Sequence, residues 1–346
     1  METNILFPAE WTPQSAVQLT WPHIDTDWMP ILDEATDCFI AIAKEIAKRE
    51  ILLIVCTDEA QIRSQLHGIN FDNVIFRRLL SNDSWARDHG GITVFINGKP
   101  VIYDFAFNGW GMKYPANFDN CITRMLAKTN TFAKEVDVMS MQPFVLEGGS
   151  IETDGKGALL TTVRCLCSDN RNEYMNKEQI EACLKDKFGL TCIHWLAYGE
   201  LEGDDTGGHI DTLARFCDEN TITYVQCTDE EDPDYRELHE MEKELKTFRT
   251  LEGNPYRLIP LPMADEMMWN GRRTPASYAN FLIINGAVLL PFYKSDKDKI
   301  AKKALQEAFP DREVIGIDCR ALVKQNGSLH CVTMQYPEGL LNITHR

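Results

Sequence analysis

The chain has 346 residues, of which 44% are hydrophobic and 25% charged, a composition that is ordinary for a globular protein and excludes a disordered one. Lys and Arg number 35 against 52 Asp and Glu, so the formal net charge is -17. Because nucleic acids and anionic membranes bind cationic surfaces, this balance argues against both as partners and is compatible with a cationic substrate.

The N-terminal segment has no basic stretch followed by an apolar run, and no segment approaches the roughly 20 apolar residues of a membrane span. The eleven cysteines form no Cys-x-x-Cys pair, so a zinc site built from paired cysteines has no support. We therefore expect a cytoplasmic protein whose cysteines are reduced thiols, mostly buried in its core.

Runs rich in β-branched and aromatic residues recur along the chain and predict strands. Asn285-Gly286 separates two of these runs and predicts a hairpin with a type I′ turn. The expected strands cover residues 51–56, 74–79, 92–96, 101–107, 158–166, 221–227, 281–285, 287–292 and 313–319.

Helical patterns lie between these strands. Residues 31–50 repeat apolar side chains at helical spacing, and Asn176 and Gly189 are placed to cap the two ends of another helix. A further helix is expected from Asp296, with Ile300 on its apolar face. This alternation predicts an α/β or α+β fold, and the lack of a glycine-rich phosphate-binding motif gives nucleotide binding little support.

Five short segments combine chemically capable side chains with glycine or other small neighbours. Their marker residues are Asp88, Glu147, His209, Asn280 and Cys331, which follow one another at intervals of 51 to 71 residues. One such segment in each stretch of similar length is typical of a repeat architecture whose units each send a loop to a common axis.

Each segment also has an ordinary interpretation. Asp88 taken alone is more simply a turn-capping or ion-paired residue. Glu147 begins a Glu-Gly-Gly sequence that suits an exposed turn, although its glycines also permit close approach of the backbone. His209 and Asp211 share one face if their segment is extended, as a general acid–base pair, a structural hydrogen bond or part of a metal site.

The C-terminal markers are ambiguous in the same way. Cys331 lies in an apolar, strand-like run, where a cysteine more often packs than reacts. His330 would then point to the opposite face of that strand, so we expect it to be structural. Asn280 is expected to be structural too, as part of the start of the hairpin.

Taken together, one thiol, one histidine and three carboxylates are too anionic for a protease-like Cys–His site, which keeps a single orienting Asp or Asn. The excess of negative charge indicates a cationic substrate. A guanidinium fits because it is planar and pairs with carboxylates through two hydrogen bonds. Its positive charge would also lower the pKa of the thiol on binding.

These motifs, in this order, resemble the agmatine deiminase and Porphyromonas-type peptidylarginine deiminase family of guanidine-modifying enzymes. The resemblance implies one catalytic domain over residues 1–346, built as a pentein-like, five-bladed pseudosymmetric α/β propeller with the site at its central axis. It implies neither a metal nor an organic cofactor. The matching segments are Trp85-x-Arg87-Asp88, Glu147-Gly148-Gly149, Arg171-Asn172, 205–216, 276–281 and 327–335.

By this resemblance Cys331 would attack the guanidinium carbon and form a covalent amidino-thioether adduct. Asp88 and Asp211 would hold the guanidinium nitrogens. His209 would protonate the departing ammonia and then activate the hydrolytic water, while Glu147 would orient His209 and favour its protonated form.

Agmatine, giving N-carbamoylputrescine, is the expected substrate. The peptidylarginine branch resembles a secreted enzyme with an added immunoglobulin-like domain, for which this chain has no signal and no spare length. The amine of agmatine needs an anionic or polar site, for which Trp85, Trp110, Asp204 and Asp205 are candidates.

Alternatives to agmatine deimination stay open. One is a deiminase that converts free or peptidyl arginine to citrulline, and another is a cationic amine-binding protein without turnover. A metal-dependent hydrolase has the least support. The expected partner is a small cationic guanidine, and homo-oligomerisation is left open.

Overall fold

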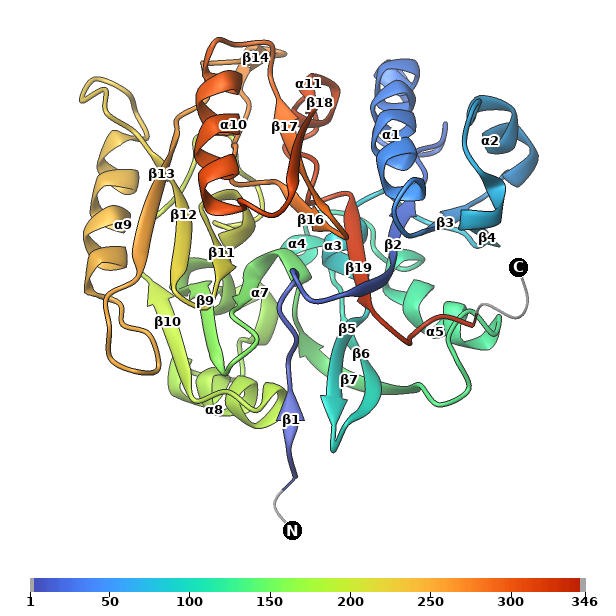
Figure 1. The fold of residues 1–346 in the computed structure, drawn as a ribbon, viewed down its shortest axis with the longest axis horizontal. Helices are drawn as coiled ribbons and strands as arrows, with labels where there is room; N and C mark the ends of the chain where they lie inside the picture. Colours follow the sequence, from blue (N-terminus) through green and yellow to red (C-terminus); the bar gives the residue numbers. More distant parts are fainter. Residues whose placement is uncertain (1–2, 343–346) are drawn as a thin grey trace.

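The computed structural model describes residues 3–342, so the outermost residues of the expected 1–346 domain lie outside it. Strands and helices alternate along the chain, and the mixed α/β class expected from the sequence is confirmed (Figure 1). Within the described residues, the strands form five sheets of three or four strands and one two-stranded ribbon.

The five larger sheets repeat one topology. In each, a first strand pairs antiparallel with a second, and the second pairs parallel with a third that follows a helix. Four of these sets are β5 (Ile92–Ile96), β6 (Lys99–Ala106) and β7 (Asp137–Val145); β8 (Ile151–Thr153), β9 (Ala158–Thr162) and β10 (Cys192–Leu196); β11 (Ala214–Asp218), β12 (Thr221–Gln226) and β13 (Arg257–Pro262); and β16 (Leu282–Ile284), β17 (Ala287–Phe292) and β18 (Glu313–Asp318).

The fifth sheet joins the two ends of the chain. Its first strand is β19 (Thr333–Pro337), and its second and third are β2 (Gln14–Thr20) and β3 (Ile51–Cys56). The remaining strands are β4 (Val74–Arg78), parallel to β3; β1 (Ile5–Leu6), antiparallel to β5; and the ribbon of β14 (Met268–Trp269) and β15 (Arg272–Arg273).

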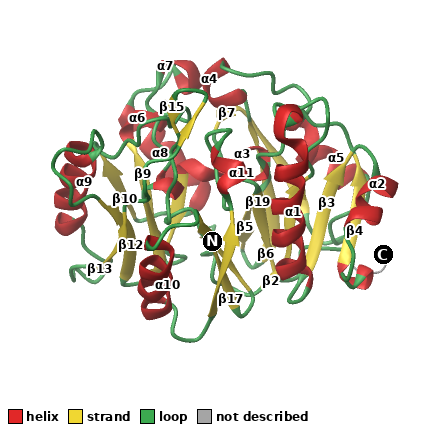
Figure 2. Ribbon diagram, turned by 90° about the horizontal axis from the view of Figure 1, so that it is seen from above, coloured by secondary structure: helices red, strands yellow, loops and turns green. Residues whose placement is uncertain are grey.

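Longer helices connect the second and third strands of each sheet. Figure 1 shows these helices at the periphery of the molecule, outside the sheets, and Figure 2 shows α9 and α2 at its two opposite ends. They are α1 (Leu32–Ala47), α5 (Ile122–Lys128), α8 (Lys177–Phe188), α9 (Tyr235–Thr247) and α10 (Lys297–Ala308), with α2 (Glu59–Gln65) between β3 and β4. No helix within residues 3–342 has the length and hydropathy needed to cross a bilayer.

Short helical turns make up the rest. The α-helical turns are α3 (Ala86–His89), α4 (Gly109–Met112), α6 (Val163–Leu166), α7 (Asp169–Asn172) and α11 (Arg320–Val323). The 3-10 turns are η1 (Met29–Ile31), η2 (Phe71–Asn73), η3 (Asp119–Cys121), η4 (Gly148–Ser150) and η5 (Ile210–Thr212). Three of these turns carry marker residues of the site: α3 includes Asp88, and η4 and η5 directly follow Glu147 and His209.

The helix ends predicted from strong capping residues are found in the structure. The capping box at Asn176 and the left-handed Gly189 at the end of α8 are confirmed. The strand expected over 158–166 is wrong in its second half. There the Thr162 side chain accepts the backbone N–H of Cys165 and starts α6.

Two further expectations are corrected. The hairpin at Asn285-Gly286 forms, but only Gly286 has a positive φ, so the turn is not type I′. The Asn285 side chain instead bonds the backbone N–H and C=O of Gln14. Ile300 was expected on the apolar face of its helix, but its side chain is 57% exposed. The buried face of α10 instead contains Ala301, Leu305 and Ala308.

The hydrophobic core lies between the sheets and the helices. It forms two clusters, and each draws side chains from both the first and the last 30 or so residues described. All eleven cysteines are free and seven of them are buried, so the expectation that most of them lie within the core is confirmed. Closure of the chain through this shared core brings its N-terminal segment next to the C-terminal Cys331 region.

Candidate active site

The five marker residues lie at equivalent positions in the repeated topology. A short way before the first strand of each sheet lies one marker, two to five positions ahead of it: Asp88, Glu147, His209, Asn280 or Cys331. Their regular spacing along the chain is therefore the length of one sheet with its crossover helix. The contacts described below bring all five side chains into one buried cluster.

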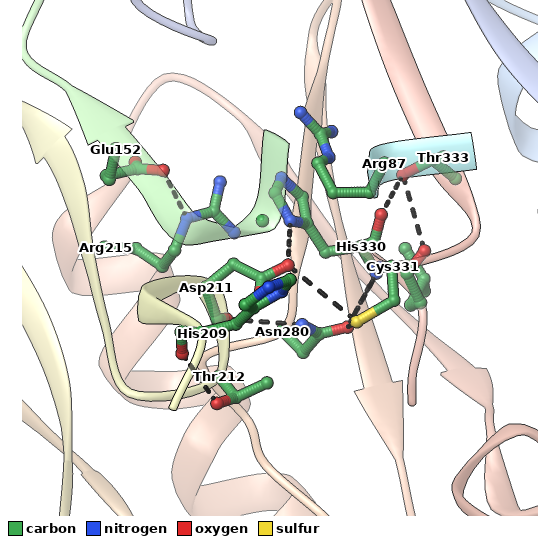
Figure 3. A network of polar contacts seen from close by, with 12 residues as sticks. Arg87, Glu152, His209, Asp211, Thr212, Arg215, Asn280, His330, Cys331 and Thr333 are labelled. Atoms are coloured by element: carbon green, nitrogen blue, oxygen red, sulfur yellow. Dashed lines mark hydrogen bonds and ion pairs between the residues drawn. The ribbon is translucent and has the colours of Figure 1, made fainter. Parts of the chain in front are cut away.

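Cys331 lies in a turn ahead of β19, not within a strand as expected. Its Sγ is 3.4 Å from Oδ1 of Asn280 and 3.8 Å from Oδ2 of Asp211 (Figure 3). Oδ1 of Asn280 also accepts the backbone N–H groups of His330 at 2.9 Å and Cys331 at 3.3 Å. Asn280 therefore supports the turn that presents the thiol, a role closer to the site than the expected one in the hairpin.

The surroundings of Cys331 disfavour its thiolate. Burial raises the pKa of Cys331 well above its usual range, and the carboxylates of Asp211 and Asp88 add to this effect. The thiol of the free protein is therefore protonated at neutral pH. A cation placed between these carboxylates and the thiol would favour the thiolate.

Asp88 is held by two donors. Its Oδ1 accepts the backbone N–H of Gly149 at 3.0 Å, and its Oδ2 accepts the indole N–H of Trp110 at 2.9 Å. Burial raises the pKa of Asp88 to about 6; nearby His209 opposes this rise and Asp211 adds to it.

Asp211 belongs to the 3-10 turn η5. Its Oδ2 lies 2.8 Å from Nδ1 of His330, while its Oδ1 is buried without a hydrogen-bond partner among residues 3–342. Burial opposes ionisation, but the bond and charge of His330, with His209, lower the pKa of Asp211. A planar cation could therefore be bound by an ionised Asp211 whose Oδ1 is free to accept from it.

His209 lies immediately before the same turn, so its segment is not the extended one under which it would share a face with Asp211. Its Nδ1 is 3.5 Å from Oδ1 of Asp88, and neither ring nitrogen has a hydrogen-bond partner within the described part of the chain. Burial disfavours the charged ring, but Asp88, Cys165 and Glu147 together raise the pKa of His209 well above 6.5. His209 is therefore an imidazolium that can give up a proton.

Glu147 is fully buried and is neutralised by an arginine. Both of its oxygens lie 2.9 Å from Nε of Arg171, and Nη2 of Arg171 donates to the backbone oxygen of Thr206 at 2.6 Å. Potential ligand atoms of Glu147, Cys165 and His209 lie within 4.8 Å of one another. Because Arg171 already pairs with Glu147 and His209 is protonated, this cluster is electrostatically unsuited to a metal ion.

Gly149 is required by the close approach of three side chains. A Cβ at this position would lie 2.6 Å from Nδ1 of His209, 2.8 Å from Oδ1 of Asp88 and 3.1 Å from Oδ2 of Asp211. This geometry explains the second glycine of the Glu147-Gly148-Gly149 sequence. It also shows that His209 and Asp211 face the same point, although their segment is not a strand.

A pocket of about 510 Å³, including its mouth, reaches Cys331. Trp85, Asp88, Trp110 and Asp205, all expected near the substrate, line it, whereas Glu147, His209 and Asp211 do not. Asp204 is not in this lining; its carboxylate instead bonds the backbone N–H groups of Thr206 and Gly208.

The pocket also holds two carboxylates that the sequence analysis missed. Asp27 and Asp83 line it together with Asp205 and Tyr114, whose hydroxyl donates to Asp205 at 2.8 Å. Burial, with Asp27 nearby, raises the pKa of Asp83 to about 7. The position of Asp83 two residues before Trp85 was the available signal, whereas nothing in the sequence places Asp27 beside it.

The chain is similar in sequence to known deiminases. The model of the Porphyromonas-type peptidyl-arginine deiminase family matches residues 6–337. The agmatine deiminase of Ectopseudomonas mendocina is 31% identical, over 95% of this chain and 95% of its own length.

Two solved structures are similar throughout. One from Porphyromonas gingivalis, provisionally named an arginine deiminase, is 53% identical, with a TM-score of 0.95 over 98% of this chain and 100% of its own. The agmatine deiminase of C. jejuni, solved as a cysteine-to-serine variant with substrate bound, is 38% identical, with a TM-score of 0.91 over 98% of each chain.

Proposed function

Because the chain belongs to the Porphyromonas-type peptidyl-arginine deiminase family, we propose that it hydrolyses agmatine to N-carbamoylputrescine and ammonia. The observation that carries this proposal is the placement of the Cys331 thiol beside two buried carboxylates, Asp88 and Asp211, in an acidic pocket. Such a site is anionic until a cation enters it, and its nucleophile becomes reactive only then.

In the proposed mechanism, Asp88 and the free Oδ1 of Asp211 accept hydrogen bonds from the guanidinium and hold its carbon against Sγ of Cys331. As the guanidinium binds, Cys331 releases its thiol proton to solvent, and the resulting thiolate bonds to that carbon. His209 gives its proton to the departing nitrogen, and ammonia leaves an amidino-thioether on Cys331. The neutral His209 then takes a proton from water, whose oxygen bonds to the same carbon as the thiolate leaves.

Glu147 acts in this scheme through charge. It makes no hydrogen bond to His209 within residues 3–342, but its carboxylate helps to raise the pKa of that imidazole. Arg171 fixes its position. Glu147 therefore keeps His209 protonated for departure of ammonia, rather than orienting the ring by a direct bond.

The acidic mouth favours agmatine over arginine. Agmatine ends in an ammonium, which Asp27, Asp83 and Asp205 would attract. Free arginine carries an α-carboxylate at the corresponding end, and the same three side chains would repel it. Trp85 and Tyr114 also line the pocket and offer apolar surface to the methylene chain.

Free arginine is the second candidate, because the 53% identical Porphyromonas gingivalis relative carries an arginine deiminase name. Ammonia release from agmatine, arginine and a blocked arginine peptide, with Cys331→Ser alongside, separates the substrates. We expect release from agmatine alone, lost in the variant. Ammonia release from arginine or the peptide would overturn the assignment of agmatine as the substrate. Tight binding of agmatine without ammonia release would favour an amine-binding protein.

The arrangement of the five sheets supports the propeller architecture and a single domain as further proposals. Each sheet repeats one topology, each contributes one marker residue to the site, and both hydrophobic clusters join the two ends of the chain. A cytoplasmic location and independence of cofactors stay predictions from the sequence, and the oligomeric state stays open.

A further inference from the structure

A buried chain of hydrogen bonds leads from Asp211 to the N-terminal segment of the protein. Nδ1 of His330 lies 2.8 Å from Oδ2 of Asp211, and its Nε2 lies 2.7 Å from Oε2 of Glu10. All three side chains are more than nine-tenths buried. Figure 3 shows the imidazole of His330 directed at Asp211 and next to Cys331, its neighbour in the chain.

The two short contacts determine how many protons these groups carry. A neutral imidazole has only one N–H. If both carboxylates were ionised, the unprotonated ring nitrogen would place its lone pair against a lone pair of a carboxylate oxygen, which is repulsive. The distances of 2.7 and 2.8 Å require either an imidazolium between two carboxylates or a neutral imidazole with one carboxyl protonated. Both arrangements leave a single negative charge on the three groups.

Other contacts favour the imidazolium. Glu10 accepts Nη2 of Arg215 at 3.0 Å and the backbone N–H of Ile283 at 2.7 Å, so it is stabilised as an anion. Despite its burial, His330 and Arg215 lower the pKa of Glu10. Burial and the nearby Arg215 and Arg87 lower the pKa of His330. The carboxylates of Glu10 and Asp211 oppose this lowering without outweighing it, so the second proton of His330 is assigned from the two short contacts, each of which ends on a carboxylate.

We propose that Glu10 and His330 are positioning residues for the deimination reaction, which hold Asp211 toward the guanidinium and keep a positive charge beside Cys331. This inference rests on the proposed function and adds two residues to its machinery. Through Oδ2, His330 fixes the carboxylate plane of Asp211 and leaves Oδ1 free for substrate. Its charge offsets that of Asp211, which otherwise disfavours the thiolate.

Glu10→Gln tests the first half of this proposal. The amide keeps the size of the side chain but removes the anion that stabilises the second proton of His330. We expect kcat/KM for agmatine to fall about 10- to 100-fold, as for loss of a carboxylate behind a functional histidine.

Glu152→Gln is the matched control. Glu152 is also buried and also bonds Arg215, at 2.8 Å, but within residues 3–342 it makes no hydrogen bond to His330 or Asp211. We expect this variant to lose stability while keeping kcat/KM close to that of the wild type.

Two substitutions of His330 separate its two contacts. In His330→Asn the amide nitrogen can replace Nδ1 and still bond Asp211, whereas in His330→Gln it can replace Nε2 and bond Glu10. We expect the Asn variant to retain more activity than the Gln variant, because only the former still orients Asp211. These variants also decide the question if Glu10→Gln fails to fold.

Alkylation of Cys331 by iodoacetamide, followed by peptide mapping, gives a readout without substrate. His330 faces the charged groups Glu10, Arg87, Asp211 and Arg215. Loss of its proton leaves Asp211 uncompensated. The apparent pKa of Cys331 alkylation should therefore rise in Glu10→Gln, rise further in His330→Asn, and stay unchanged in Glu152→Gln.

The outcomes are decisive in each direction. Equal losses of activity in Glu10→Gln and Glu152→Gln, or alkylation profiles of Glu10→Gln and His330→Asn that coincide with the wild type, would overturn the proposal. If the wild type released no ammonia from any guanidine, the proposed function would fail. The alkylation profiles would still show whether Glu10 and His330 control the thiol.

Discussion

Trp110 donates its indole N–H to Oδ2 of Asp88 at 2.9 Å, deep in the pocket that reaches Cys331. The sequence analysis placed Trp110 at the amine end of the substrate. Its bond to Asp88 instead connects it to the guanidinium end, where it fixes the rotation of the carboxylate. Trp110 itself has a left-handed φ of 55°, between Gly109 and Gly111, so the local backbone is strained to aim this ring.

Trp110→Phe should therefore impair catalysis while preserving the aromatic surface of the pocket. We expect kcat/KM for agmatine to fall about 10- to 150-fold, since one hydrogen bond to a charged group is lost, worth roughly 1.5–3 kcal/mol. Trp195→Phe is the control, because its indole N–H bonds Glu181 away from the pocket. Equal activity of the two variants would argue against a role for Trp110 in holding Asp88.

The affinity of Cys331→Ser for propylguanidine, which lacks the amine, should report the ionisation of Asp88 without interference from the thiol. Burial raises the pKa of Asp88 to about 6, so its carboxylate binds the cation above that pH and loses it as the pH falls. We expect affinity to weaken about tenfold per pH unit below 6. A transition near the ordinary pKa of Asp, about 3.9, would contradict the burial argument.

The binding affinity for agmatine should depend on pH through a second group, which does not affect the affinity for propylguanidine. Asp83 lines the pocket mouth with a pKa raised to about 7 by burial, so its carboxylate forms as the pH rises through that value. The ratio of agmatine to propylguanidine affinity should therefore increase from pH 6 to pH 8. Asp83→Asn should flatten this ratio and raise the KM for agmatine with little change in kcat, because the amine contact is the same in substrate and transition state.

Gly149→Ala should abolish activity in a protein that still folds. The added Cβ would lie 2.6 Å from Nδ1 of His209 and 2.8 Å from Oδ1 of Asp88, so both side chains must shift from the guanidinium site. Gly253→Ala is a control for the cost of backbone change, since its left-handed φ of 85° is strained but nothing lies within 4 Å. Retained activity in Gly149→Ala would show that the cluster tolerates displacement.

Arg171→Gln should destabilise the whole fold. It leaves the fully buried Glu147 without its cation and removes the bond from Arg171 to the Thr206 backbone. Breaking one side of a buried pair costs about 3–5 kcal/mol. A urea titration measures this loss, and the double variant with Glu147→Gln should recover part of it because no unpaired charge then stays buried.

The sequence by itself determined the features that depend on neighbouring residues and on the identity of reactive side chains. The capping box of α8 and the hairpin position at Asn285-Gly286 follow from local backbone chemistry. The markers Asp88, His209 and Cys331 could be named because reactive side chains recur beside small residues, and their roles followed from the resemblance of these segments to a known family. Their regular spacing reflected the repeated sheet topology.

Only the tertiary structure decided how these side chains are held. His330 was expected on the far face of a strand, but the chain turns there, and its imidazole joins Asp211 to Glu10, 320 residues away in the sequence. Asp27 and Asp83 meet at the pocket mouth for the same reason. Closure of the fold brings distant segments into contact and removes water from between their charges, and neither effect is encoded in any local pattern of residues.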